Sequence, residues 1–181
     1  MNNKFIFIFL ATISCATQST HAVRNCLHDA AERGRALELK NLIDTRKYDI
    51  NAQDNNVHNF TPLHYAVSHG YVLSVKTLLS GGANVNAVDD FGHTPLHIAS
   101  WKGRVDCIKV LIENNAIMNL QDKKSWTPLH VAAFWEQIDC VKCLVAAGAS
   151  ICAETTEGKT PKAIALEKDY EEIAALLQET K

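Results

Sequence analysis

Four histidines stand in equivalent places along the 181-residue chain, and a regular row of imidazoles suggests metal binding. His64, His97 and His130 are evenly spaced, and His28 occupies the matching place in an earlier, less regular segment. A fixed period of about 33 residues predicts stacked units, whose packed helices lie about 8–10 Å apart. Zinc ligands lie about 2 Å from the ion, so single histidines in such a row cannot converge on it. We therefore expect no metal site and a structural role for the row.

Two cysteines with CxxC spacing, Cys140 and Cys143, raise the alternative of a small redox or metal-binding protein. A redox pair needs an exposed helix N-terminus that stabilises the thiolate. Both cysteines instead fall within a predicted helix. Cys140 also stands one repeat period after Cys107, so their Cα atoms are expected about 10 Å apart, beyond the disulfide limit of about 7 Å. We interpret these cysteines as small core residues and keep the redox hypothesis as the least favoured one.

The elements that position these residues begin at a repeated Thr-Pro-Leu-His sequence. Thr is a good N-cap because its hydroxyl accepts a backbone N–H, and Pro suits the first helical position, where no N–H is needed. Each copy therefore predicts a helix start. Asn25-Cys26-Leu27-His28 takes this place in the first unit, and Thr160-Pro161 in the last. The copies comprise Thr61, Pro62 and His64; Thr94, Pro95 and His97; and Thr127, Pro128 and His130.

Each predicted first helix ends at a turn and is followed by a second helix. Gly34, Gly70 and Gly103 stand at the same distance after the motif histidine and suit a left-handed turn. Glu136 stands there in the fourth unit, so its turn is expected to be less tight or strained. Apolar residues with spacing i, i+3, i+6 and i+7 place one face of the second helix in the core. A second turn at Gly82, Asn115 or Gly148 leads into an extended segment.

The order of helix, turn, helix and extended hairpin within each period resembles the ankyrin repeat, over essentially all of residues 24–181. The resemblance implies an all-α solenoid of about five stacked helix-turn-helix units with short β-hairpin loops. The motif histidine is then similar to a structural residue that ties helix and hairpin backbones together. The expected units are approximately 24–55, 59–88, 92–121, 125–154 and 158–181. The polar residues Glu171 and Gln178 make the last helix suitable as a solvent-facing cap.

Four aromatic residues occupy places that the repeat does not require to be apolar: Trp101, Trp126, Phe134 and Trp135. Trp101 and Phe134 occupy equivalent places in successive units, so they should be neighbours in one column. The resemblance implies that hairpin tips and the inner surface of the first helices bind partners, and exposed aromatic clusters favour interfaces. We expect these four side chains to anchor a protein-binding surface. The alternative is that they fill gaps between adjacent repeats.

The first 22 residues have the layout of a secretory signal peptide. Lys4 precedes an apolar stretch from Phe5 to Ile13, and small and polar residues follow. Cleavage is expected after Ala16 or Ala22, and residues 23–181 are expected to form the ankyrin-repeat domain. A buried β-strand is the alternative for the same stretch. The leader predicts export, to the periplasm or the medium, with no membrane association after its removal.

No sequence motif for catalysis is present: there is no Gly-x-Ser-x-Gly, no phosphate-binding loop and no His-Glu-x-x-His. Five repeats occupy the chain after the leader, and the formal net charge of −2 gives no sign of a nucleic-acid partner. We therefore predict a monomeric, exported, non-enzymatic protein–protein interaction module without cofactors. The alternative is a periplasmic or secreted accessory factor that supports an enzyme. If the source is an intracellular bacterium, the expected partner is a host protein.

Overall fold

The computed structural model describes residues 26–55 and 57–178. The predicted leader, both cleavage positions and the expected helix cap at Asn25 lie outside these residues. Within them the chain forms ten helices that follow one another in pairs. Their bounds are α2 Cys26–Glu32, α3 Ala36–Asp44, α4 Pro62–His69, α5 Val72–Ser80, α6 Pro95–Lys102, α7 Val105–Glu113, α8 Pro128–Phe134, α9 Ile138–Ala146, α10 Pro161–Glu167 and α11 Glu171–Leu176.

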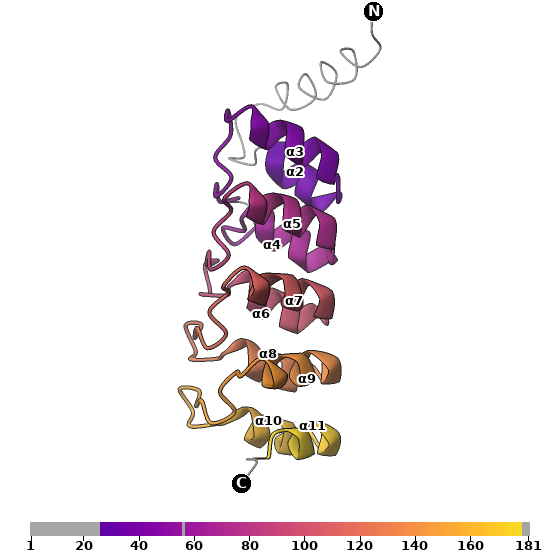
Figure 1. The fold of residues 1–181 in the computed structure, drawn as a ribbon. Coiled ribbons are helices and arrows are strands. Elements are labelled where there is room, and N and C mark those ends of the chain that lie inside the picture. Colours follow the sequence, from indigo (N-terminus) through magenta and orange to yellow (C-terminus); the bar gives the residue numbers. More distant parts are fainter. Residues whose placement is uncertain (1–25, 56, 179–181) are drawn as a thin grey trace, which may run out of the picture.

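The helix pairs stack into one elongated column, with the loops between pairs on one side (Figure 1). The first helices α2, α4, α6, α8 and α10 pack in one row, and the second helices α3, α5, α7, α9 and α11 pack in another. Each pair, called here repeats one to five, contacts chiefly its neighbours in sequence. The predicted all-α repeat solenoid is confirmed for the described residues.

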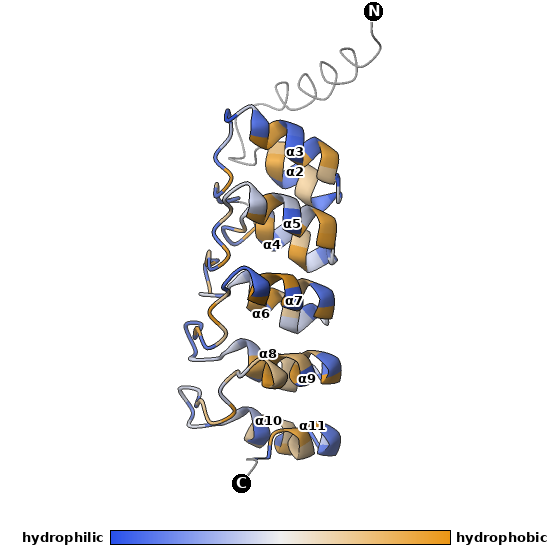
Figure 2. Cartoon of the chain, in the orientation of Figure 1, coloured by the Kyte–Doolittle hydropathy of each residue, from blue (hydrophilic) through white to orange (hydrophobic). Residues whose placement is uncertain are grey.

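The core runs through the column as a row of leucines from the repeated motif. Leu27, Leu63, Leu96 and Leu129 are almost fully buried, with at most 1% of each side chain exposed. Burying one leucine contributes about 1.5–3 kcal/mol, so stacking supplies the stability that no single repeat could provide. Figure 2 shows hydrophobic residues concentrated in the helices, whereas helix ends and loops carry many hydrophilic ones.

The first helices of repeats two to five begin at the predicted Thr-Pro pairs. Thr94 is extended, with φ −85° and ψ 167°, and its side chain accepts the N–H of His97. Pro95 then supplies the first helical residue. Thr61, Thr127 and Thr160 adopt the same extended conformation before their prolines. The helix starts follow from these local preferences, because the cap uses an N–H that the helix leaves without an internal partner.

Glu136 makes the same inter-helix turn as the glycines at equivalent positions. Its φ is 56°, against 78° for Gly70 and 68° for Gly103. The turn is closed in each case by a 2.9 Å backbone hydrogen bond, from Gln137 to Ala132 in repeat four. The companion bond is longer in repeat four, 3.4 Å from the Glu136 N–H to the Ala133 carbonyl against 2.9 Å from Gly70 to Val67. A side chain in this left-handed conformation costs about 1–2 kcal/mol.

The loops between repeats are hairpin-shaped but contain almost no β-structure. Among the described residues, the single β-bridge pairs Asp54 with Phe60. Each loop is closed by one backbone hydrogen bond across its base, such as Asp89 N–H to His93 O at 3.0 Å. We call residues 54–60, 89–93, 122–126 and 155–159 the hairpin loops. The loops are too short to extend into a ladder, because each continues directly into the cap of the next helix.

Asparagine side chains join the extended segments of successive repeats, a feature that the sequence analysis did not identify. Asn51 Oδ1 accepts the N–H of Asn84 at 2.7 Å, and Asn86 Oδ1 accepts that of Ile117 at 2.9 Å. Asn119 Oδ1 accepts the N–H of Ser150 at 2.9 Å. These bonds satisfy backbone donors that a β-ladder would otherwise use, so successive repeats are joined on the hairpin side without strands.

The last repeat closes the column. Ile173, Ala174 and Leu177 of α11 and its C-terminal turn are buried toward repeat four. Glu171 and Gln178 are exposed, in the places where repeat four has Ile138 and Val145. The apolar side of α11 therefore faces the stack and the polar side faces solvent, as a terminal repeat requires.

Candidate protein-binding groove

The motif histidines link each repeat to the next one. His64 Nε2 lies 3.1 Å from the carbonyl oxygen of His93, and His97 Nε2 lies 3.0 Å from that of Trp126. His28 and His130 make the equivalent contacts, with Phe60 and Lys159. Each imidazole thus joins the start of a first helix to the base of the following hairpin loop.

The hydrogen-bond partners of His97 determine which of its ring nitrogens carries the hydrogen. The backbone N–H of Thr94 can only donate, so Nδ1 accepts it at 3.1 Å. The carbonyl of Trp126 can only accept, so Nε2 carries the hydrogen. Burial lowers the pKa of His97 to about 4, and burial likewise lowers the pKa of His64 to about 4. Burial also lowers the pKa of His130. His64, His97 and His130 are therefore neutral at physiological pH, and their ring nitrogen atoms are engaged in structural bonds.

His93 behaves differently because two carboxylates face it. Its Nδ1 lies 3.0 Å from Asp89 Oδ2 in the same hairpin loop, and its Nε2 lies 3.4 Å from Asp122 Oδ2 in the next loop. The hydrogen bond with Asp89 raises the pKa of His93 against the effect of partial burial. Asp89 Oδ1 also accepts the N–H groups of Phe91 and His93, both at 2.8 Å. His93 therefore links the hairpin loop before the third repeat to the hairpin loop before the fourth.

The four predicted aromatic residues converge on this region. Trp101 and Trp135 lie with ring centroids 5.9 Å apart and ring planes at 38°. Phe134 contacts Trp126 edge-to-face at 5.2 Å and Trp135 at 5.4 Å. Trp101 therefore makes its ring contact with Trp135, the residue that follows its expected column neighbour Phe134. Phe134 is the last residue of α8 and packs toward Trp126 in the hairpin loop, which leaves Trp135 beside Trp101.

These rings line an open groove of about 430 Å³ between the hairpin loops and helices α6 and α8. Ile98 and Val131 contribute to its floor, and both are buried. Trp101 is 39% exposed and Trp135 is 49% exposed, whereas Trp126 and Phe134 are half-buried. We call this feature the aromatic groove. Trp126 and Phe134 shape it by packing, and Trp101 and Trp135 present free surface.

Phe91 is a groove residue that the sequence analysis missed. It stands in the hairpin loop 89–93, is 47% exposed, and contacts His93 with ring centroids 5.7 Å apart. A turn of the type Asp-Asp-Phe-Gly needs no apolar residue at its third position. An apolar residue at a turn position that does not require one could have identified Phe91 from the sequence.

Four lysines border the aromatic groove and were also missed. Lys102 Nζ lies 3.6 Å from the ring centroid of Trp101, and Lys168 Nζ lies 4.2 Å from that of Phe134. Lys123 and Lys124 line the groove from hairpin loop 122–126. Lys102 and Lys168 stand one repeat period before and after Trp135, so the period itself aligns them with the aromatic column.

The cysteines of the CxxC sequence do not form a reactive site. Cys140 and Cys143 lie inside α9 and are not joined to each other. Burial raises the pKa of the Cys140 thiol to about 12 and that of Cys107 to about 11. A thiol with a raised pKa is a poor nucleophile and a poor metal ligand near neutral pH. This environment supports the interpretation of Cys107 and Cys140 as core side chains, and Cys143 packs against the core while partly buried.

Within residues 26–55 and 57–178, no group of three His, Cys, Asp or Glu side chains is arranged to hold a metal ion. The same residues contain no helix with the length and apolar character needed to cross a bilayer.

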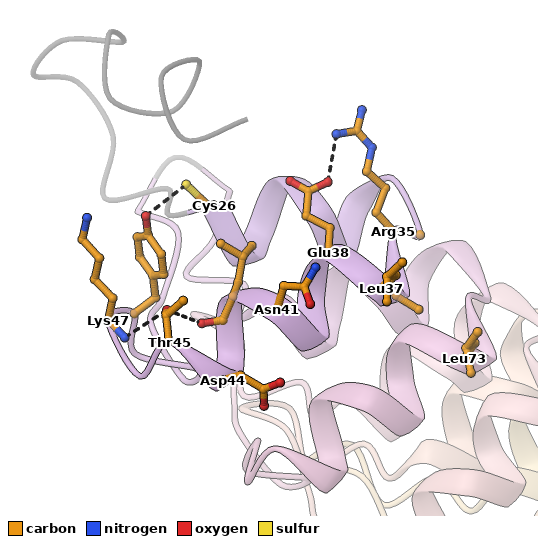
Figure 3. Close-up of a pocket in the computed structure, with 13 residues that line it drawn as sticks. Cys26, Arg35, Leu37, Glu38, Asn41, Asp44, Thr45, Lys47 and Leu73 are labelled. Carbon is orange, nitrogen blue, oxygen red and sulfur yellow. Dashed lines mark hydrogen bonds and ion pairs between the residues drawn. The ribbon is translucent and has the colours of Figure 1, made fainter. Parts of the chain in front are cut away.

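A second, larger depression of about 1030 Å³ follows the exposed side of α3 in repeat one (Figure 3). Leu37 and Leu73 line it and are 75% and 69% exposed. The equivalent residues in the later repeats are Asp106, Asp139 and Glu172. The apolar pair is thus specific to repeats one and two. Unlike the aromatic groove, this depression lies on the second-helix side of the stack.

The stacked pairs and their hairpin loops define a helical repeat solenoid with an aromatic groove on its first-helix side. The family described as "Ankyrin repeats (3 copies)" matches the chain at residues 3–89, 27–122, 75–155 and 114–181. The protein belongs to the ankyrin-repeat family. Members of this family are generally protein–protein interaction modules without enzymatic activity.

Two spider proteins contain segments similar to part of the chain. Delta-latroinsectotoxin-Lt1a of Latrodectus tredecimguttatus is 40% identical over 65 residues, which is 35% of this chain and 5% of the relative. Alpha-latrocrustotoxin-Lt1a of the same species is 41% identical over 61 residues, which is 34% of this chain and 4% of the relative. The chain therefore corresponds to a small part of the length of either relative.

Proposed function

We propose that the protein binds a protein partner through the aromatic groove of repeats three and four. The exposed pair Trp101 and Trp135 carries this proposal. Exposed tryptophans are costly to leave in water and are the side chains most enriched at the energetic centres of interfaces. In repeats one, two and five their places are taken by polar or charged residues, so the aromatic pair is not a requirement of stacking.

Half-buried Trp126 and Phe134 have a supporting role in the proposal. The carbonyl oxygen of Trp126 is hydrogen-bonded to His97, which positions the Trp126 backbone. Phe134 packs edge-to-face against the Trp126 ring. A partner side chain would therefore meet rings that are already ordered, and binding would cost little conformational entropy.

The experiment compares two double variants of the full chain with the wild type. Trp101→Ala with Trp135→Ala removes the exposed groove surface, and Leu37→Ala with Leu73→Ala removes exposed apolar surface elsewhere. Partners are captured with the wild-type chain, and the affinity of each purified partner for the three proteins is measured by calorimetry. We expect at least a tenfold loss for the groove variant and little change for the control.

A groove variant that binds with unchanged affinity while its melting temperature falls would show that the tryptophans merely pack between repeats. Circular dichroism of both variants separates loss of binding from loss of fold. The identity of the partner distinguishes a general binding module from an accessory factor for an enzyme. Capture from a periplasmic fraction and from host-cell lysate provides that comparison.

We also propose that binding takes place outside the cytoplasm after removal of residues 1–22. The proposal is supported by the apolar stretch Phe5 to Ile13 behind Lys4. N-terminal sequencing of exported protein is expected to begin at Thr17 or Val23. An intact Met1 on exported protein would contradict the leader.

A further inference from the structure

We infer that the segment recognised by the aromatic groove is acidic, with Asp or Glu residues flanking an apolar anchor side chain. The inference rests on the proposed function and names the chemistry of its partner. Four lysines stand at the border of the groove: Lys102, Lys123, Lys124 and Lys168. All four are exposed.

The charges of these lysines are not neutralised by neighbouring carboxylates. Within the described part of the chain, none of the four makes an ion pair within 4.0 Å. On the second helices, by contrast, Lys109 pairs with Asp106 at 3.2 Å and Lys142 pairs with Glu172 at 3.1 Å. The four lysines at the groove therefore carry charge that no ion pair matches.

Three acidic groups near the groove already have partners. Asp89 and Asp122 both face His93, and Asp122 Oδ1 also accepts the N–H groups of Lys124 and Trp126 at 2.7 and 2.8 Å. Glu167 pairs with Lys159 at 2.8 Å. These three carboxylates are engaged with His93 and Lys159 and form no ion pair with the bordering lysines, whose charge remains available to a partner.

Two of the lysines are held in place by the rings that line the groove. Lys102 lies over Trp101 and Lys168 lies over Phe134, at 3.6 and 4.2 Å from the ring centroids. Cation–π contact draws each ammonium group toward the groove instead of letting it extend into solvent. An anchor that enters between the rings would therefore bring its flanking residues close to fixed positive charges.

A single-stranded nucleic acid is the other polyanion that aromatic and basic surfaces bind. Such binding requires open ring faces on which bases stack. Here Lys102 covers a face of Trp101, Lys168 covers a face of Phe134, and Trp101 and Trp135 contact each other. The geometry consequently favours an acidic peptide segment over a nucleic acid.

The test selects random 12-residue peptides displayed on phage against the immobilised full chain at about 0.15 M salt. We expect the enriched peptides to combine an apolar anchor with two or more Asp or Glu residues. Their synthetic forms should bind several-fold more weakly when salt is raised to 0.5 M, because screening weakens exposed charge pairs. Binding of the oligonucleotide dT20 is measured alongside and is expected to be absent.

Matched charge reversals test whether peptide binding depends on the lysines at the groove. Lys123→Glu with Lys124→Glu should weaken the selected peptides at least tenfold. Lys40→Glu with Lys76→Glu, which reverses two exposed lysines on α3 and α5, should leave their binding unchanged. Equal effects of the two double variants would mean that only net charge matters and would overturn the inference.

Other outcomes separate this inference from the proposed function. Peptides that need Trp101 and Trp135 but are neutral or basic would overturn the acidic preference and leave the groove as a binding site. Peptides that bind equally well without the two tryptophans, or a selection without enrichment, would count against the groove itself. Tight binding of dT20 at the groove would replace the peptide by a nucleic acid.

Discussion

His97 and Trp126 join the third repeat to the fourth: the imidazole Nε2 donates to the carbonyl oxygen of Trp126 across 3.0 Å. The same ring accepts the N–H of Thr94, so one neutral side chain satisfies backbone groups of two adjacent repeats. Because the chain continues from Trp126 into the N-cap Thr127, this bond also sets the position of the next helix. The bond joins two residues that line the aromatic groove.

We predict that His97→Leu destabilises the protein by about 3 kcal/mol. The change leaves the Thr94 N–H and the Trp126 carbonyl without partners, and each buried unsatisfied group costs about 1–3 kcal/mol. Urea unfolding followed by circular dichroism measures the loss. The exposed His69 provides the control, since His69→Leu should change stability by less than about 0.5 kcal/mol. A loss as small as this for His97→Leu would contradict the proposed role of the bond.

Acid should destabilise the stack through His64 and His97. Their pKa values fall from 6.5 in the unfolded chain to about 4 when folded. Groups with lowered pKa values contribute stability that is present above pH 6.5 and is lost as the pH falls toward 4. Each histidine accounts for roughly 3 kcal/mol over that range. Urea unfolding at pH 7.0, 5.5 and 4.5 tests this, and His97→Leu should show a smaller acid loss. Equal stability at pH 7.0 and 4.5 would rule out the mechanism.

His93 should have the opposite pH dependence. Its pKa is raised, first by the hydrogen bond with Asp89, so the bridge to Asp89 and Asp122 is fully charged below pH 6.5. Its stabilisation is lost as the pH rises through the raised pKa. The difference in unfolding free energy between wild type and His93→Gln should therefore be larger at pH 6 than at pH 9. The NMR titration of His93 should give a pKa above 6.5, and a value below 6.5 would refute the bridge.

Glu136→Gly should stabilise the protein by about 1 kcal/mol. The substitution relieves a side chain held at φ 56°, and part of that gain is offset by the greater freedom of glycine in the unfolded chain. Asn115→Gly is the matched comparison, because Asn115 has φ 64° but asparagine tolerates this conformation better. The urea midpoint should rise more for Glu136→Gly, with an unchanged slope. A larger gain at Asn115 would contradict the assignment of strain to Glu136.

Much of the fold could be predicted from the sequence because its signals are local. The Thr-Pro pairs mark helix starts within one residue, and Gly70, Gly103 and Asn115 mark left-handed turns. The left-handed conformation of Glu136 could not be predicted from its residue type. It follows from the closing bond between Gln137 and Ala132, which forces the turn whichever residue stands there.

The sequence by itself determined the period, the helix pairs and the columns in which equivalent residues stand, since caps, turns and apolar spacing act over a few residues. Only the tertiary structure decided which side chains of different columns touch. Packing between repeats directs Phe134 toward Trp126, leaves Trp135 beside Trp101 and places Lys102 and Lys168 over rings. Side-chain rotamers respond to contacts made one repeat away along the chain, and no local preference specifies those contacts.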